Sequence, residues 1–158
     1  EQFPIFHLPD SIIFKFKKFA ISFISEVGIL CCVKNAINGT IVRGLGEGAY
    51  FMSMEHYQKE IQKKLGFKAY PGTLNLKVEK KQMDLFKNID PIKIDGFKKD
   101  NKTFGGADCY KSKINDVDGS IIVPHLTKHK NIIEVIAPVH LKSELKLKDG
   151  DKIKVELT

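Results

Sequence analysis

The hydrophobic positions of this chain follow two different periods. In one stretch the apolar residues recur at helical spacing, at Met54, Tyr57, Ile61 and Leu65. Ser53 is a suitable N-cap and Gly66 a suitable C-terminal cap for this segment. Opposite charges lie four residues apart on it, Glu55 with Lys59 and Glu60 with Lys64. The pattern predicts one clear amphipathic helix.

The other hydrophobic runs are short, and several alternate with polar residues. Residues 73–78 alternate strictly, which is typical of a half-buried strand. Further extended segments are expected at residues 40–42, 49–52, 107–114, 121–123, 132–137 and 153–157, with turns at 115–119 and 149–150. Residues 79–104 are polar and turn-rich and give no clear prediction. Many short strands with one clear helix predict a mainly β fold, a small closed β-barrel, and argue against Rossmann and P-loop sheets.

The first 36 residues differ from the rest of the chain. Residues 19–33 are almost wholly apolar but carry two serines, a glutamate and a glycine. This run is too short and too interrupted for a membrane span, so a helix, or a helix and a strand, packed on the main domain is favoured. We interpret residues 1–36 as an N-terminal extension of uncertain role and residues 37–158 as the barrel domain.

Composition and charge narrow the choice of partner. The chain has 158 residues, 42% of them hydrophobic, and a net charge of +7. The positive charge suits nucleic acid or a small phosphorylated ligand, but a solvated lysine-rich surface explains it equally well. Cys31, Cys32 and Cys109 form no disulfide or zinc pattern, which favours a reducing, cytoplasmic location.

Three features carry candidate chemistry. The glycines in residues 44–48 could direct backbone N–H groups at an anion, although the Walker pattern is absent and a simple hairpin explains them too. Thr73 and Asn75 project to one side of a strand and could ligate one Mg²⁺, or could be ordinary polar residues on a wet face. Glu134 is the one charge in an apolar strand, so it is either a general base or a structural or outward-facing residue.

Taken in order, the segments of this chain resemble the archaeal CTP-dependent riboflavin kinases. The resemblance runs from about Gly39 to Val155 and rests on GLGEGAYF at 44–51, LGF at 65–67, YPGTLNL at 70–76, DGSIIVP at 118–124, IIEVIAP at 132–138 and LKDGD at 147–151. It implies a cradle-loop β-barrel that transfers the γ-phosphate of CTP to the 5′-hydroxyl of riboflavin, giving FMN and CDP.

The resemblance also implies roles for particular residues. Nucleotide contacts are expected from two segments, Gly44, Leu45, Gly46, Glu47, Gly48, Ala49 and Val139, His140, Leu141, Lys142. Mg²⁺ ligation is expected from Thr73 and Asn75, flavin contacts from Thr127 and Glu134, and catalysis from Glu134 as general base. The family often has arginine where this chain has Ala49, which implies that one charge contact to the phosphates is absent here. It often has arginine where this chain has Lys142, which implies a weaker bidentate contact. Candidates for the isoalloxazine slot are Phe67, Phe104 and Tyr110.

Two other classes of function are considered. A basic nucleic-acid-binding barrel would need aromatic residues alternating with lysines on one sheet face, and no such pattern is present. It would also leave Thr73, Asn75 and Glu134 without a role. A barrel of the same fold could phosphorylate another alcohol or bind nucleotide without turnover. No stable nucleic-acid partner and no membrane partner are expected, and the sequence carries no signal for oligomeric state.

Overall fold

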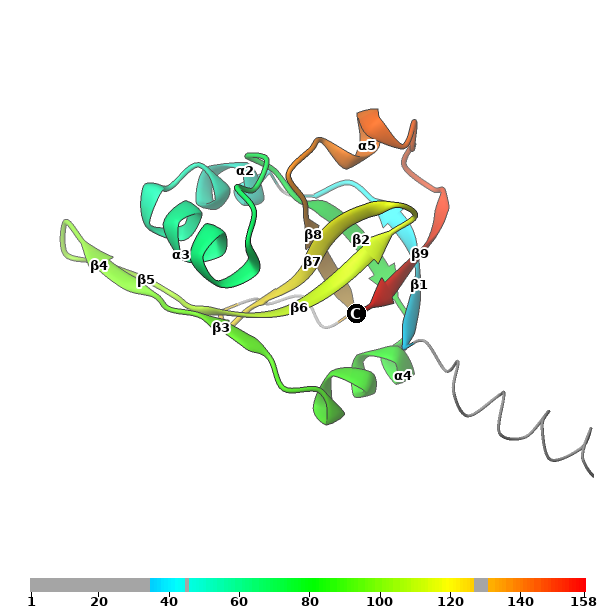
Figure 1. Ribbon diagram of the computed structural model, residues 1–158, viewed down its shortest axis with the longest axis horizontal. Helices are drawn as coiled ribbons and strands as arrows, with labels where there is room; N and C mark the ends of the chain where they lie inside the picture. The colour runs from blue at the N-terminus through cyan, green and yellow to red at the C-terminus, as the bar shows by residue number, and fades with distance from the viewer. Residues whose placement is uncertain (1–34, 45, 127–130) are drawn as a thin grey trace, which may run out of the picture. The chain divides into compact units, whose positions relative to one another are not determined.

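The computed structural model describes residues 35–44, 46–126 and 131–158 (Figure 1). Residues 1–34, which hold the expected N-terminal element together with Cys31 and Cys32, lie outside the described residues. So do the two site candidates Leu45 and Thr127. The division of the chain at residues 36 and 37 stays a prediction.

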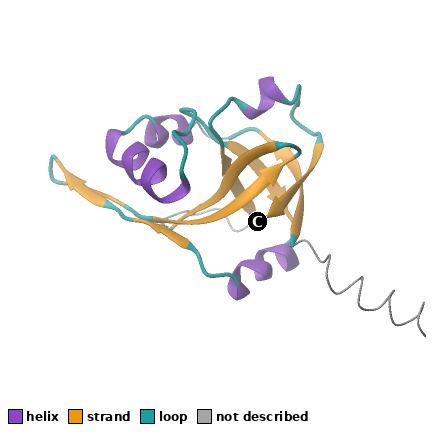
Figure 2. Cartoon of the chain, in the orientation of Figure 1, coloured by secondary structure: helices purple, strands orange, loops and turns teal. Residues whose placement is uncertain are grey.

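Six antiparallel strands of the described part of the chain close into a barrel (Figures 1 and 2). They are β1 (Ala36–Val42), β2 (Leu74–Val78), β6 (Ala107–Ile114), β7 (Val117–Pro124), β8 (Ile132–Ile136) and β9 (Lys152–Leu157). Their order around the barrel is β6-β7-β8-β2-β1-β9, and β9 pairs back onto β6 to close it. The predicted closed β-barrel is therefore confirmed.

Strand β6 uses only part of its length to close the barrel. Its second half pairs with β9, from Ser112 to Ile114, and its first half pairs with β3 (Ile92–Ile94). β3 and β6 lead into a hairpin made of β4 (Phe97–Lys99) and β5 (Lys102–Phe104). The hairpin extends from the barrel wall as an arm, and its tip holds Asp100 and Asn101 in the left-handed region, at φ 49° and 60°.

Successive side chains along each strand point to opposite faces of the barrel wall, so the hydrophobic residues form two clusters, one inside the barrel and one outside it. Inward-facing side chains form the barrel interior, including Ile41, Leu76, Ile121, Ile133 and Val155. Side chains of α4 (Lys80–Met83) and the 3-10 helix η1 (Asp84–Asn88) pack against this interior. Tyr110 belongs to the same cluster and its ring lies 4.6 Å from that of Phe86. Tyr110, one of the three aromatic candidates from the sequence, is therefore a side chain of the barrel interior.

The second cluster lies on the outer face of β6, β7 and β8. Here α2 (Glu47–Met52) and α3 (Glu55–Leu65) cover the sheet, and Figure 2 shows the helices arranged around the strands. Met52, Tyr57, Ile61 and Leu65 of the helices pack with Ile94, Cys109, Ile122 and Ile136 of the strands. The apolar stripe that predicts α3 is thus the face that covers the barrel wall.

Helix α3 confirms most of the local predictions. Gly66 ends it in the left-handed region at φ 87°, and its N–H donates to the Gln62 carbonyl at 3.1 Å. Glu55–Lys59 and Glu60–Lys64 each form an ion pair at 2.6 Å. The predicted N-cap is wrong, because Met54 occupies that position. Ser53 instead ends α2, and its hydroxyl donates to the Tyr50 carbonyl at 2.7 Å.

Two other local predictions are corrected. Residues 49–52 are helical within α2, not extended, because Phe51 and Met52 pack into the outer cluster as part of one short turn of helix. The turn after β6 is shorter than the predicted 115–119, since β7 begins at Val117 and Asn115 takes the left-handed conformation at φ 52°. Within the described residues, no helix combines the length and apolar character needed to cross a membrane.

Candidate functional site

The glycine segment lies directly against the Thr73–Asn75 segment. A Cβ atom added at Gly44 would overlap the Asn75 side chain, and one added at Gly48 would overlap the Thr73 side chain. Glycine is therefore required at both positions by close approach of the two segments. Gly46, between them, takes the left-handed conformation at φ 85° and begins α2. The two parts of the chain that were singled out in the sequence thus meet in space.

Thr73 and Asn75 are neighbours on one side of the chain. Thr73 immediately precedes β2 and Asn75 lies within it, and the Asn75 Nδ2 atom is 3.4 Å from Thr73 Oγ1. Both residues are half-buried. A hydroxyl and an amide oxygen are hard donors that Mg²⁺ accepts, and neither is charged. Among the described residues no group of three or more His, Cys, Asp or Glu side chains is placed to hold a metal. The pair therefore fits a cation that phosphate groups also ligate.

Glu134 stands directly beside this pair. In the pairing of β2 with β8, Glu134 is the partner of Asn75, and in the pairing of β7 with β8 it is the partner of Ile122. The flanking residues Leu74 and Val135 are buried in the barrel interior, so Asn75 and Glu134 project to the outer face. The half-buried carboxylate of Glu134 thus lies between the polar pair and the apolar wall under α3.

The second expected nucleotide segment adjoins the same place. The Tyr70 N–H donates to the Ala137 carbonyl at 2.8 Å, and the Tyr70 ring lies 5.0 Å from that of His140. His140 precedes the short helix α5 (Leu141–Glu144), and its Nδ1 atom is 2.6 Å from Ser143 Oγ. These contacts hold the segment after β8 next to the residues that lead into Thr73.

The remaining candidates of these segments differ in exposure. Leu141 is buried in the barrel cluster, which indicates a structural side chain, so any nucleotide contact there comes from its backbone. Lys142 forms an ion pair with Asp149, with Nζ 2.6 Å from Oδ1. Val139 is half-buried, and Glu47 and Ala49 are exposed on α2. Ala49 therefore leaves open surface at its position on α2.

Three large hydrophobic side chains in the described part of the chain are exposed, and all three lie beside candidate residues. Tyr50 is 59% exposed and follows Ala49, Tyr70 is 39% exposed and precedes the Thr73 turn, and Leu126 is 72% exposed and precedes Thr127. Sequence analysis gave none of them a role. Their signal was present, since each is a large apolar residue next to a polar or glycine-rich turn. Exposed apolar side chains next to polar residues are typical of ligand-binding surfaces.

The described cysteine takes no part in this site. Cys109 is buried in the outer cluster, and burial raises the pKa of its thiol to about 12. The thiol is therefore protonated at neutral pH and is not a nucleophile. Burial also raises the pKa of Tyr57, whose hydroxyl donates to the Gly105 carbonyl at 2.6 Å.

The part of the chain that is similar to known proteins includes all of these segments. The family model CTP-dep_RFKase, described as a domain of unknown function, DUF120, matches residues 41–157. A riboflavin kinase from Archaeoglobus fulgidus is 43% identical over 125 residues, covering 77% of this chain and 54% of the relative. One from Thermococcus kodakarensis is 46% identical over 127 residues, covering 78% and 59%. One from Pyrobaculum aerophilum is 43% identical over 123 residues, covering 75% and 59%. The chain thus spans little more than half the length of these relatives.

Proposed function

The chain belongs to the archaeal CTP-dependent riboflavin kinase family, and we propose that it transfers the γ-phosphate of CTP to the 5′-hydroxyl of riboflavin, giving FMN and CDP. The observation that carries the proposal is the meeting of three separate segments at one point. Gly44 and Gly48 lie against Asn75 and Thr73, and Asn75 is the cross-strand partner of Glu134. The proposal includes a cytoplasmic location and no stable nucleic-acid or membrane partner.

The nucleotide would lie along the glycine segment. The backbone N–H groups of Gly44, Gly46 and Gly48 would supply donors for phosphate oxygens, and glycine leaves no side chain in the way. The segment from Val139 to Lys142 supplies the second side of the nucleotide site, next to the exposed Tyr70 ring. Lys142, once it contacts a phosphate or the ribose, would exchange its ion pair with Asp149 for that contact.

The metal of the proposed reaction is Mg²⁺, and the Thr73 hydroxyl and the Asn75 amide oxygen are the groups of this chain that would hold it. When bound, the cation neutralises charge on the phosphates of the donor. The neutral donor pair is consistent with this role, because the nucleotide supplies the negative charge that Mg²⁺ requires.

Glu134 would accept the proton of the ribityl hydroxyl. The hydroxyl oxygen forms a bond to the γ-phosphorus, the bond from that phosphorus to the bridging oxygen of CDP breaks, and the proton moves to the carboxylate. CDP keeps the electron pair of the broken bond and leaves. Positioning and charge neutralisation supply most of the acceleration in such transfers. The place of Glu134 between the polar pair and the apolar wall suits a group that faces both substrates.

The experiment that tests the proposal is an assay of FMN formation from riboflavin and Mg²⁺, with CTP and ATP compared in parallel. FMN formed with CTP and little with ATP is the expected result. FMN formed with ATP alone would keep the kinase and contradict the choice of donor. If the folded chain forms no FMN with either nucleotide, the proposed activity is wrong. Thr127 as a flavin contact is tested in the same assay by the riboflavin KM of Thr127→Ala.

A further inference from the structure

The side chain of Gln58 joins two segments that are separate in the sequence. Gln58 lies near the start of α3 and is half-buried. Its Nε2 atom donates to the Met52 carbonyl and, at 2.9 Å, to the Ala69 carbonyl. Its Oε1 atom accepts from the Ala69 N–H at 3.1 Å. Both N–H donors of the amide and its oxygen are therefore engaged with backbone groups.

These three backbone partners require an amide at position 58. Two carbonyl oxygens face Nε2 and one N–H faces Oε1. A carboxylate has acceptors only, so in Gln58→Glu it would repel the same two carbonyls. A methionine side chain has a similar length and shape but no N–H donor, so Gln58→Met removes the hydrogen bonds and keeps the volume. The two substitutions therefore separate the hydrogen bonds from the packing.

The backbone groups that Gln58 contacts have little access to water. Met52 is 4% exposed and Ala69 is 3% exposed. Met52 is the last residue of α2, so its carbonyl has no partner inside that helix. A buried carbonyl or N–H without a partner loses its hydrogen bonds to water and gains none in return. Gln58 thus holds the end of α2 and the backbone at Ala69 in fixed positions relative to each other.

Each of these segments leads to one side of the proposed phosphate site. Gly48 lies one helical turn before Met52, and it lies directly against the side chain of Thr73. Ala69 lies four residues before Thr73 on the other segment. The separation of Gly48 and Thr73 therefore depends on how α2 and the segment after α3 are joined.

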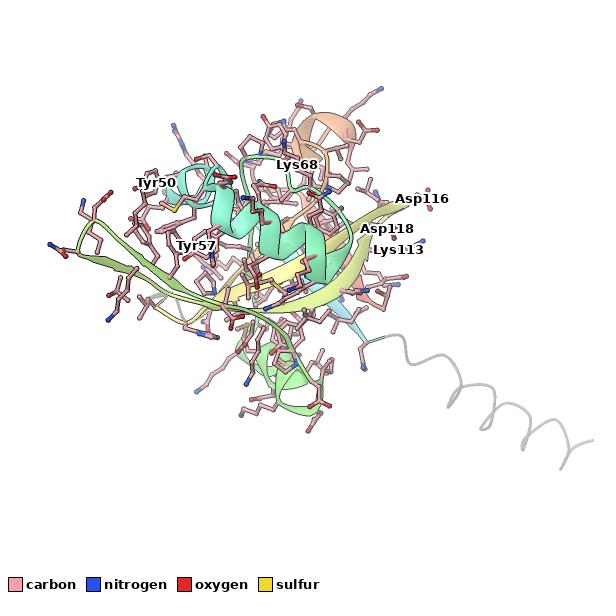
Figure 3. All side chains as sticks on the ribbon, turned by 60° about the vertical axis from the view of Figure 1, so that its left-hand side comes forward. Tyr50, Tyr57, Lys68, Lys113, Asp116 and Asp118 are labelled. Carbon is pink, nitrogen blue, oxygen red and sulfur yellow. The ribbon has the colours of Figure 1, made fainter. Side chains whose placement is uncertain are left out.

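Gln58 is the hydrogen-bonded bridge between them. In the part of the chain that the structure describes, no hydrogen bond joins residues 47–52 directly to residues 69–73. In Figure 3, Tyr50 of α2 and Lys68, the residue before Ala69, are both drawn beside α3. Because α3 packs on the barrel wall through its apolar face, the wall supports the bridge.

We infer that Gln58 is a positioning residue, which fixes the glycine segment against Thr73 through its hydrogen bonds to Met52 and Ala69. The inference rests on the proposed function. The amide acts only through backbone groups and takes no part in the chemical step. A shift of about 1 Å in the groups that position a substrate can slow a reaction about a hundredfold. Loss of the bridge is therefore expected to lower turnover more than an equal loss of stability elsewhere on α3.

The test compares kcat, the Mg²⁺ concentration for half-maximal activity and the melting temperature. Gln58→Met is expected to lower kcat about tenfold and to raise the Mg²⁺ concentration severalfold, and Gln58→Glu to do more. Ile61→Val is the stability control, because Ile61 is fully buried on the same helix and loses one methyl group without touching the bridge. Gln62→Met is the surface control, since Gln62 is exposed. Both controls are expected to keep their kcat.

A double variant shows whether Gln58 acts through the glycine segment. Gly48→Ala displaces the Thr73 side chain and so disturbs the same contact. The effects of Gln58→Met and Gly48→Ala on kcat/KM are therefore expected to be smaller together than their product, whereas those of Ile61→Val and Gly48→Ala multiply. Effects of Gln58→Met and Gly48→Ala that multiply would mean that Gln58 serves stability alone.

The outcomes separate this role from the proposed activity. If the unaltered chain forms FMN and Gln58→Met keeps its kcat and its Mg²⁺ dependence, the positioning role is wrong and the kinase stands. A folded chain that forms no FMN with CTP or ATP overturns both. Hydrogen exchange of the Ala69 N–H, which Gln58 Oε1 accepts, tests the bridge without any assay of activity. Exchange that is no faster in Gln58→Met than in Ile61→Val would contradict it.

Discussion

Asn75 and Glu134 are direct partners across the antiparallel pair of β2 and β8. Both side chains project from the outer face of the barrel, one amide and one carboxylate, next to the glycine segment that contacts Asn75. Opposite positions on one sheet face have Cβ atoms about 5 Å apart. One strand therefore supplies the proposed metal contact and its neighbour the proposed base, so each role has its own test.

Glu134→Gln is expected to lower kcat by at least a hundredfold, because an amide cannot accept the proton of the ribityl hydroxyl. Gln has nearly the same shape, so nucleotide affinity should change little. The measurement is steady-state FMN formation together with a CTP binding titration. Turnover equal to that of the unaltered chain would remove the general-base role from Glu134.

Asn75→Ala is expected to raise the Mg²⁺ concentration needed for half-maximal activity by about tenfold, the effect of one lost metal contact. Lys77→Ala is the matched control, since Lys77 lies two residues further along the same face of β2 and is exposed. The measurement is an activity titration with Mg²⁺ at saturating CTP. If the Mg²⁺ curves of Asn75→Ala and the control coincide, Asn75 is not a ligand.

Gly44→Ala is expected to lower kcat/KM by at least tenfold, because the new methyl group displaces the Asn75 side chain. The matched control is Gly66→Ala. Gly66 is left-handed at φ 87° with no atom within 4 Å of an added Cβ, so alanine there costs about 1 kcal/mol of stability and touches no candidate residue. Activity and thermal melting are measured for both. A Gly44→Ala chain with unchanged kcat/KM would contradict the close packing of the glycine segment on Asn75.

The buried thiol of Cys109 gives a prediction for alkaline pH. Burial raises its pKa from 9.0 to about 12, so above the lower value the unfolded chain releases a proton that the folded chain keeps. The free energy of unfolding should therefore fall as the pH rises through this window. Tyr57 and Tyr110 have raised pKa values for the same reason and act in the same direction.

Denaturant unfolding of the full chain and of Cys109→Ala, at about pH 8 and about pH 10, isolates the contribution of this thiol. The alanine variant is less stable at both pH values because it leaves a cavity. From about pH 8 to about pH 10, the free energy of unfolding should nevertheless fall less in Cys109→Ala than in the unaltered chain. Equal losses would show that Cys109 does not hold its proton through folding.

Much of the barrel follows from periodicity in the sequence. Residues 73–78, 107–114 and 153–157 alternate because one side of each strand must fill a closed interior, and α3 shows helical spacing because one stripe covers the barrel wall. Residues 79–104 gave no prediction, since β3, β4 and β5 are three-residue strands, too short to show a period, and β3 pairs only with β6. The prediction of an extended segment at Ala49–Met52 was wrong, because a run of four residues does not distinguish the helical period from the alternation of a strand.

The candidate site was visible only in part. Spacing alone places Thr73 and Asn75 on one side of the chain, and the close hydroxyl and amide agree with that. The position of Glu134 beside Asn75 depends on the register between β2 and β8, which no local pattern specifies. Tyr50 and the hairpin aromatics were missed as a group for the same reason, because α2 and the arm meet only after the barrel has closed.

The divided pairing of β6 lets the arm and the barrel change independently. Barrel closure depends on the half of β6 that meets β9, whereas the β4–β5 hairpin grows from the half that meets β3. Residues added or removed at the Asp100–Asn101 tip do not alter the register that seals the barrel. A lineage can therefore reshape the hairpin arm by insertion or deletion while the fold that holds Asn75 and Glu134 in place is preserved.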